Sequence, residues 1–417
     1  MIKIVRIPKV LNNFFETFAG HFNKRSFIHF KILCIMIALS CENKTINQIS
    51  FGLAFGAHRT KLNDFLIHSP WNEKDVLKDM ANKTLKKLYK KGAPIFLVLD
   101  DSKKKKTGKH VEGTGTIFDP VAKTYMKGHQ FLAATIYYRG YTIPYAIRLY
   151  LKKEISKELN KPFKKLPELA QEIINELDIP FNAPVYILTD SFYANKTVID
   201  AARIKDFHFI GALKENRTFI IKGIKTNVES YIQNTFKKKK KSKTSLKTKK
   251  GISSYSFIST ITNISKIGSC RLVLSRKGSH KKILAIACTD INLDPTKIIE
   301  FYSFRWSIEV WFKQAKQHLS LGALHRRCLS GVIKHLHLSA CAYLLLTHLN
   351  ISSAKGKRKN TAVSASLLSL QNQLKDILLD DMFNAYIENQ KSDYIKNAIT
   401  IMKNKIININ YNDLLVA

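Results

Sequence analysis

Two short apolar runs, each followed by aspartate, constrain the fold of this 417-residue chain more than any other feature. Residues 95–99 read Ile-Phe-Leu-Val-Leu and lead into Asp100-Asp101-Ser102, while residues 185–188 lead into Thr189-Asp190-Ser191. Solid apolar runs of this length are typical of strands that are buried on both faces of a sheet. The sequence therefore predicts two buried strands that deliver carboxylates at their C-terminal ends.

The segments around these two strands indicate the class of fold. The expected order is a hairpin of strands 129–138 and 141–150 joined by Arg139-Gly140, a crossover helix 166–177, the second aspartate strand, a helix 196–205 and a strand 208–213. This order of strands and helices is that of a ribonuclease H-like α/β core. Lys103 to Lys106 and Lys109 are expected to form a basic loop beside the first aspartates.

The next apolar run of similar quality, residues 283–288, follows only after about seventy residues that contain strand-like stretches at 255–262 and 270–275. This interval is read as an inserted β domain. It includes a lysine-rich run between Lys237 and Lys250, which has two interpretations: a solvated loop, or a loop that becomes ordered along DNA phosphates.

A stretch of helical character contains Tyr302, Arg305, Glu309 and Lys316 at intervals of three, four and seven residues. On one continuous helix these four side chains would share a narrow arc, with Ile308, Trp311 and Ala315 among the apolar residues on a separate arc. Asp294-Pro295 is expected to begin the preceding helix. Ser307 can cap a new helix, and a break there would leave the shared arc secure only for Glu309 and Lys316.

The charge of the chain points to a polyanionic partner, because 69 basic residues stand against 31 acidic ones, for a formal net charge of +38. Nucleic acid is the first candidate. Residues 44–66 read as two short helices around a glycine-containing turn, so they are either a helix-turn-helix or part of a plain helical bundle. The charge favours contact with DNA.

No membrane partner is expected, since the run 32–39 is too short to span a bilayer and the apolar segment 336–349 is interrupted by polar residues. The N-terminus lacks the apolar core of a signal peptide, which predicts a cytoplasmic protein. The six cysteines form no CxxC pair and favour buried thiols over zinc ligands or disulfides; they are Cys34, Cys41, Cys270, Cys288, Cys328 and Cys341.

Two strand-end aspartates and Glu309 would supply hard oxygen ligands without cysteine or histidine. Such a set suits Mg²⁺ or Mn²⁺ bound together with substrate phosphates. A pair of ions about 4 Å apart can activate an attacking water or 3′-hydroxyl and stabilise the leaving oxygen of a phosphodiester. Taken singly, each carboxylate is more simply a helix cap, a turn residue or part of a solvated face.

The spacing of Tyr302, Arg305, Glu309 and Lys316 resembles the YREK signature of the bacterial insertion-sequence DDE transposases that move by cut and paste. The segments 99–102, 188–191 and 305–309 are also similar to that family, and the resemblance covers residues 30 to 350. It implies a ribonuclease H-like catalytic domain with a β insertion, an N-terminal domain that binds terminal inverted repeats, and an active dimer across two paired DNA ends.

The resemblance also implies roles for residues. Asp190 and Glu309 would be metal ligands, and Tyr302, Arg305 and Lys316 would hold DNA phosphates. The first ligand is Asp100 in the family pattern Asp-x-Ser/Thr, or Asp101 if the aspartate directly precedes the Ser/Thr, and Asp100 is favoured. The family reaction nicks the element's end, passes through a hairpin intermediate and inserts the 3′-hydroxyl into target DNA.

Related enzymes place a tryptophan in the insertion to receive a flipped base, but Trp71, Trp306 and Trp311 all lie outside it here. An aromatic face of another kind can accept a base. The candidates in the insertion, among which the sequence does not choose, are Phe219, Tyr231, Phe236 and Tyr255.

The expected organisation has five parts: a helical DNA-binding domain at 1–90, the first part of the core at 91–213, the lysine-rich β insertion at 214–281, the second part of the core at 282–350 and a helical tail at 351–417. Two rival functions stay open. One is a catalytically retired DNA-binding protein descended from a transposase, and the other is a ribonuclease H-like nuclease or junction resolvase.

Overall fold

The computed structural model of the chain describes residues 6–39, 45–51, 58–108, 110–119, 122–179, 181–221, 223–236, 238, 240–248, 251–323, 327–354 and 366–388. The chain divides into two compact units. The helical unit takes residues 1–84, 108–112 and 313–417, and the sheet unit takes residues 85–107 and 113–312.

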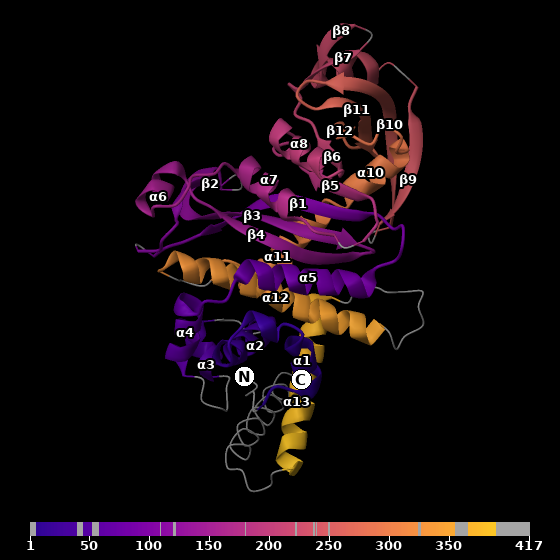
Figure 1. Cartoon of the computed structure of the whole chain (residues 1–417). Helices are drawn as coiled ribbons and strands as arrows, with labels where there is room; N and C mark the ends of the chain where they lie inside the picture. The colour runs from indigo at the N-terminus through magenta and orange to yellow at the C-terminus, as the bar shows by residue number, and fades with distance from the viewer. Residues whose placement is uncertain are drawn as a thin grey trace, which may run out of the picture. The chain divides into compact units, whose positions relative to one another are not determined.

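The sheet unit is built on one mixed sheet of twelve strands in the described residues, with the path β2-β3-β1-β5-β6-β12-β11-β10-β7-β8 and with β4 paired to β3 and β9 to β10 (Figure 1). The pairs β1–β5 and β5–β6 are parallel and the other pairs are antiparallel. The expected α/β class is therefore confirmed. The strands are β1 (Ile95–Lys105), β2 (Gly115–Asp119), β3 (Thr124–Tyr138), β4 (Tyr141–Tyr150), β5 (Val185–Thr189), β6 (His208–Ala212), β7 (Thr218–Ile221), β8 (Ile224–Asn227), β9 (Ser242–Thr248), β10 (Gly251–Ile264), β11 (Gly268–Lys277) and β12 (Leu284–Cys288).

Helices cover this sheet where the apolar sequence patterns predicted them. Helices α7 and α8 contact each other and pack against β3, β4 and β6, while α10 contacts β6, β11 and β12 (Figure 1). The predicted crossover helix and the helix after the second aspartate are both confirmed to within one residue. The helical segments are α6 (Lys153–Glu158), α7 (Leu166–Glu176), α8 (Lys196–Ile204), α9 (Val228–Tyr231), the π-helical turn η2 (Ile232–Phe236) and α10 (Pro295–Ser303).

The hairpin between β3 and β4 is confirmed with the expected two-residue connection. Tyr138 pairs with Tyr141, and the intervening Arg139 and Gly140 have φ angles of 47° and 85°. Positive φ at both central residues is the conformation of a type I′ turn, whose twist matches that of the flanking strands. Glycine meets this requirement without steric cost.

We expect Gly140→Ala to destabilise the sheet unit by about 1 kcal/mol, because alanine is strained at positive φ. A Cβ at Gly140 would meet nothing within 4 Å, so the cost comes from the backbone alone. Urea unfolding followed by circular dichroism measures the change. Gly20→Ala is the matched control, since Gly20 is equally open but lacks the positive φ; an equal loss of stability in both variants would contradict the explanation.

Strand β1 is longer than predicted, and the expected basic loop at Lys103 to Lys106 is wrong as far as Lys105. The parallel pairing of β1 with β5 ends at the pair Leu99 and Thr189, but the antiparallel pairing with β3 continues to Lys105 opposite Gly128. Beyond Leu99 the edge of β1 that faces β5 has no strand partner among the described residues, and Lys103, Lys104 and Lys105 alternate between the two faces of the sheet. Local sequence could not reveal this extension, which depends on the length of β3.

The predicted β insertion contains strands β7 to β11, as expected, but it is continuous with the core sheet. Strand β11 pairs with β10 on one side and with β12 on the other, and β12 pairs with β6. Part of the lysine-rich run forms a strand, since β9 pairs with β10 over its whole length. The simple loop interpretation is therefore wrong for residues 242–248, whereas residues 237, 239, 249 and 250 lie outside the described part.

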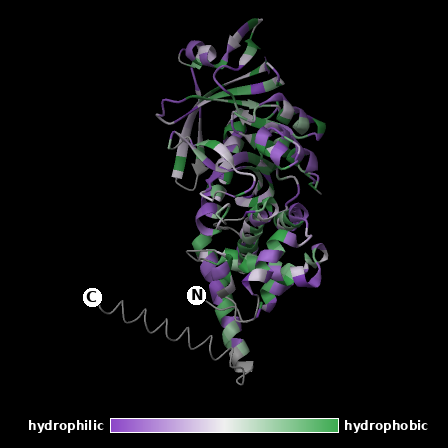
Figure 2. Ribbon diagram, turned by 90° about the vertical axis from the view of Figure 1, so that its left-hand side faces the viewer, coloured by the Kyte–Doolittle hydropathy of each residue, from purple (hydrophilic) through white to green (hydrophobic). Residues whose placement is uncertain are grey.

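The helical unit packs the N-terminal helices together with the C-terminal ones. Helix α12 contacts α2, α4 and α13, and α2 contacts α4. Figure 2 shows hydrophobic residues concentrated along these helices and hydrophilic residues toward their outer surfaces. The segments are α1 (Lys9–Glu16), the 3₁₀ turn η1 (Ala19–His21), α2 (Lys24–Ala38), α3 (Ile46–Phe51), α4 (Arg59–His68), α12 (Leu329–Ala354) and α13 (Leu367–Glu388), with α5 (Glu73–Leu88) and α11 (Trp306–His318) running from one unit into the other.

One helix of the described residues, Leu329–Ser353, is long and apolar enough to cross a membrane by composition, and most of it is buried inside the fold. It contacts three other helices of its unit, which is the environment of a core helix. Helices α3 and α4 exist and contact each other, but the glycine-containing turn predicted between them, residues 52–57, lies outside the described residues. Of the predicted helical tail at 351–417, residues 355–365 and 389–417 also lie outside them.

The cysteine prediction is confirmed where the structure describes it. Cys34, Cys270, Cys288 and Cys341 are buried free thiols, and Cys328 is a half-buried free thiol. Cys41 lies outside the described residues.

Candidate active site

Asp100 and Asp190 lie at the ends of neighbouring parallel strands. The last parallel pair joins Leu99 of β1 to Thr189 of β5, so each aspartate is the next residue along its chain. Because side chains alternate between the faces of a sheet, both residues after this pair are directed to the same face. Asp190 then turns the chain away from the sheet, since its Oδ1 accepts the backbone N–H groups of Phe192 (2.9 Å) and Tyr193 (3.3 Å).

The same alternation separates Asp100 from Asp101. Asp101 points to the opposite face, where its two oxygens accept hydrogen bonds from the Tyr193 hydroxyl (3.0 Å) and the Gln130 amide (2.7 Å). Asp100 instead lies within 3.7 Å of the Arg305 guanidinium, measured from Oδ2 to a terminal nitrogen. The structure thus gives Asp101 two fixed partners and leaves Asp100 on the face that carries Asp190 and Arg305.

The segment with the four spaced polar residues is two helices, so the alternative of a break near Ser307 is confirmed and the single continuous helix is wrong. Helix α10 ends at Ser303 and α11 begins at Trp306, which places Tyr302 in the first helix, Arg305 in the connection and Glu309 in the second. The start of α10 agrees with expectation, because Asp294 caps it and Pro295 is its first residue. Lys316 follows Glu309 on α11 after about two helical turns.

Aromatic packing holds this broken segment against the sheet. Phe304 stacks on Tyr137 of β3 with ring centres 4.6 Å apart, and Phe301 packs edge-on against Phe96 of β1 at 4.7 Å. Ile308 and Trp311, two of the residues expected on the apolar side of α11, are fully buried. These contacts fix Tyr302 and Arg305 by tertiary packing rather than by helical phase.

Arg305 joins the helices to the strand carboxylates. Its guanidinium contacts Asp100 and forms a hydrogen-bonded ion pair of 2.5 Å with Oε1 of Glu309. Only 17% of the Arg305 side chain is exposed, so the low local dielectric strengthens both attractions. Tyr302 lies beside Arg305, whose guanidinium carbon is 6.0 Å from the centre of the tyrosine ring.

Burial and the negative charge of Asp190 raise the pKa of Asp100 to about 7, although Arg305 opposes the rise. Burial, followed by the carboxylates around it, also raises the pKa of Tyr193 well above its usual range. Burial is the larger cause of both pKa shifts, and the negative charge of the carboxylates where the two strands end adds to it. A divalent cation bound there would offset that negative charge.

The chemistry of the donors fits a hard cation, since Asp100 and Asp190 present carboxylate oxygens without competing sulfur or imidazole. The arrangement is incomplete as it stands. Among the described residues, no three His, Cys, Asp or Glu side chains lie close enough together to hold a metal ion. The third carboxylate, Glu309, is engaged by Arg305.

The structure also shows nearby residues that the sequence did not single out. Tyr193 is fully buried against Asp101, and two aromatic side chains beside the carboxylates are exposed: Phe192 at 45% and Trp306 at 61%. The signal for Trp306 was its place between Arg305 and Glu309. Trp306 lies outside the insertion, where the resemblance places the aromatic residue.

The aromatic candidates within the insertion separate by burial. Phe219 and Phe236 are each only 1% exposed, so neither presents a face to a base, while Tyr231 and Tyr255 are half-buried. Phe236 is instead covered by cations, with Lys241 5.4 Å and Arg276 5.8 Å from its ring centre.

Two family models match the chain. One, described as DDE superfamily endonuclease, matches residues 17–242, which is more than half of the sequence. The other, described as transposase DDE domain, matches residues 163–345. The first match contains Asp100 and Asp190, and the second contains Asp190, Arg305 and Glu309. No curated protein matches the chain.

Proposed function

The chain belongs to the DDE superfamily of endonucleases, and from this premise we propose that it is a DNA transposase that cleaves and joins the terminal inverted repeats of its own insertion sequence. The observations that carry the proposal are that Asp100 and Asp190 follow the last pair of two neighbouring parallel strands, and that Arg305 contacts both Asp100 and Glu309. Asp100 and Asp190 repel each other, so their placement at neighbouring strand ends is costly to the fold and supports a role in binding a cation.

The finer assignment is to the cut-and-paste group with the YREK signature and a ribonuclease H-like catalytic core. The antiparallel β1–β3–β4 strands followed by parallel β5 and β6 support it. In this assignment Asp100, Asp190 and Glu309 hold the metal, and Asp101 supports the site through Tyr193. Glu309 becomes available when Arg305 turns to a phosphate of the DNA.

Two Mg²⁺ or Mn²⁺ ions would activate the attacking oxygen and stabilise the leaving oxygen of the phosphodiester. The residues of the chain provide the remaining requirements. Arg305 offers a fork of N–H donors that matches a phosphate, and Tyr302, whose pKa is raised by burial, keeps its proton as a hydrogen-bond donor. Lys316, further along α11, contributes a positive charge to the same strand of DNA.

The partner in this proposal is double-stranded DNA, both the element's ends and the target. The excess of basic residues suits such a partner. The active form would be a homodimer across two paired ends, working in the cytoplasm of a prokaryote in association with the nucleoid.

The test is an incubation of the purified protein with Mg²⁺ and a duplex that carries the inverted repeat flanking its own coding region. We expect a break at the repeat boundary and joining of the new 3′-hydroxyl to a target plasmid. A duplex with a scrambled repeat is the control. Binding without any cleavage would replace the proposal with a retired DNA-binding protein, and cleavage of branched DNA without joining would replace it with a resolvase-like nuclease.

Trp306 is expected to stack on a base near the cleaved position. Replacing it with alanine should weaken binding of the repeat duplex by about 1–3 kcal/mol, whereas Trp306→Phe should retain most of the affinity. Anisotropy of a labelled duplex measures the affinity of each variant. Quenching of tryptophan fluorescence in the wild-type protein reports the stacking itself, because Trp71 and Trp311 are buried and only Trp306 is exposed. Leu368→Ala, at a similarly exposed side chain on α13, is the control; affinity unchanged in Trp306→Ala would refute the stacking role.

A further inference from the structure

A cavity of about 550 Å³ opens in the helical unit between the first turns of α2 and the length of α4. None of its residues belongs to the candidate active site. Its lining residues come from these two helices and the short segment after α4: Asn23, Lys24, Arg25, Ser26, His29, Lys61, Asp64, Phe65, His68, Ser69 and Pro70.

The rim of this α2–α4 cavity is cationic. Lys24, Arg25 and Lys61 carry permanent charge, two histidines stand among them, and Asp64 is the one acidic residue of the lining. Burial, and then the charge of Lys61, lowers the pKa of His29, so Lys61 acts on the interior of the cavity. The lining as a whole therefore favours an anion.

The beginning of α2 conflicts with the usual placement of charge on a helix. Its first turn contains no acidic residue and instead begins with Lys24 and Arg25. Cations at this end oppose the helix dipole, which costs stability at each residue. Because an anion bound at the helix start would reverse this cost, the conflict is of the kind expected at a functional site.

Hydroxyl groups form part of the lining. Ser26 and Ser69 are 7% and 9% exposed, and their Oγ atoms are 2.6 Å apart. One hydroxyl donates to the other, which leaves the second hydroxyl proton of the pair available to a ligand. Beneath them, the buried amino group of Lys334 donates to the Ser69 carbonyl, so a further cation lies close to the cavity.

We propose that the α2–α4 cavity binds a backbone phosphate of duplex DNA. This inference rests on the proposed function, because it makes the cavity part of how the transposase holds its DNA. Duplex DNA is favoured over an acidic protein, since His58, Arg59 and Thr60 are exposed at the start of α4, where the second helix of a helix-turn-helix meets DNA. A phosphate held between α2 and α4 would fix the register of that helix.

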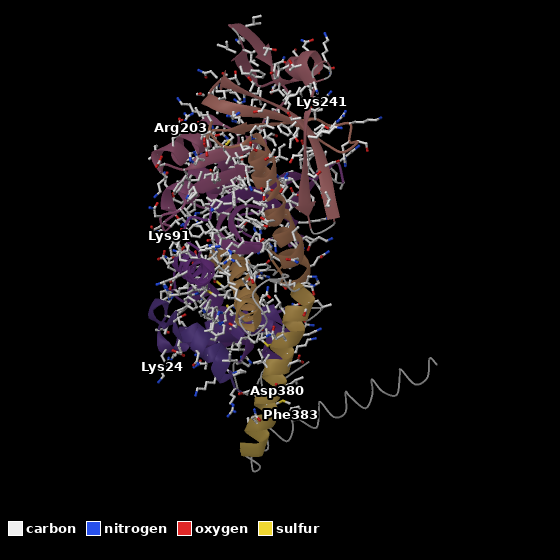
Figure 3. The ribbon with its side chains drawn as sticks, turned by 90° about the vertical axis from the view of Figure 1, so that its right-hand side faces the viewer. Lys24, Lys91, Arg203, Lys241, Asp380 and Phe383 are labelled. Atoms are coloured by element: carbon white, nitrogen blue, oxygen red, sulfur yellow. The ribbon has the colours of Figure 1, made fainter. Side chains whose placement is uncertain are left out.

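The experiment measures DNA binding in Glu309→Gln protein with chelator present, so that cleavage plays no part. Anisotropy of a labelled 40-base-pair duplex is followed from low to high salt, for the repeat sequence and for a random sequence. The cavity variant is Lys24→Ala/Lys61→Ala; Lys24 is labelled on the surface in Figure 3. The matched control, Lys9→Ala/Lys74→Ala, loses the same charge from exposed positions on α1 and α5.

We expect the cavity variant to bind about tenfold more weakly and to lower the slope of log affinity against log salt by about one to two. Both effects should be equal for the two duplexes, since a phosphate contact carries no sequence information. The control and the charge-preserving Lys24→Arg/Lys61→Arg variant should keep the wild-type slope. All four lysine positions are exposed in their helices, and far-ultraviolet circular dichroism checks that each variant folds.

An unchanged slope in Lys24→Ala/Lys61→Ala, or a loss limited to the repeat duplex, would overturn the inference. So would binding of a labelled poly-glutamate peptide that depends on these lysines while the DNA slope stays constant. These outcomes leave the proposed function standing. Absence of any DNA binding by the Glu309→Gln protein itself would instead remove the DNA partner, and with it the proposed function.

Discussion

Asp190→Asn is expected to reduce cleavage of the repeat duplex at least about a thousandfold while DNA binding stays within a few-fold of wild type. The asparagine oxygen can still accept the backbone N–H groups of Phe192 and Tyr193, so the turn after β5 survives. What disappears is the negative charge at the strand end. Gel assays of product formed in a single turnover, with binding measured in parallel, separate the two effects.

Glu309→Gln should behave in the same way, because the side chain keeps its length and an oxygen that faces Arg305. The matched control is Asp200→Asn, a surface carboxylate of α8 that pairs only weakly with Arg203 at 3.6 Å. Cleavage by Asp190→Asn or Glu309→Gln at the level of Asp200→Asn would show that these carboxylates do not take part in the reaction.

Much of the catalytic half of the fold could be predicted because its signals are local. Solid apolar runs identify β1 and β5, and Arg139-Gly140 identifies the type I′ hairpin. The capping aspartate and following proline identify the start of α10. Each signal acts within a few residues, so a single sequence contains enough information to place it.

The features that the sequence did not reveal depend on distant partners. The extension of β1 through Lys105 follows from the length of β3, and the continuity of the insertion with the sheet follows from the pairing of β11 with β12. The end of α10 at Ser303 is fixed where Phe304 stacks on Tyr137, a residue more than 160 positions earlier. Helical spacing alone cannot report a break that is stabilised by packing.

The structure distinguishes Asp100 from Asp101, which the sequence could not do. In sequence the two carboxylates are adjacent and chemically identical, and only their alternation across β1 distinguishes them. Asp101 is held by Tyr193 and Gln130, whereas Asp100 faces Arg305. This arrangement supports Asp100 as the proposed ligand and leads to a prediction about its cost to the fold.

Asp100→Asn is expected to abolish cleavage and yet to stabilise the metal-free protein at pH 8. The pKa of this carboxyl is about 7 in the folded protein, against a usual value of 3.8, so the folded state holds a proton that the unfolded chain releases. Stability therefore falls as the pH rises from about 4 to above 7, by an amount on the order of 4 kcal/mol at most. Asparagine avoids this loss and can still accept the Asp101 N–H.

Urea unfolding of both proteins with chelator present, at pH 4 and at pH 8, measures the effect, because the two proteins differ only in the carboxyl of Asp100 and in what depends on its charge. The stabilisation should be small at pH 4 and reach its full size above pH 7. Asp101→Asn serves as the control on the opposite face: it loses an acceptor for Tyr193 or Gln130, so it should be destabilised at both pH values.

A gain of stability in Asp100→Asn that does not change with pH would show that burial and Asp190 do not raise the pKa of Asp100 in the folded protein. A gain that appears only at high pH would mean that, without metal, the ionised Asp100 carboxylate lowers the stability of the folded protein. Such a loss of stability is expected at a site that binds a cation.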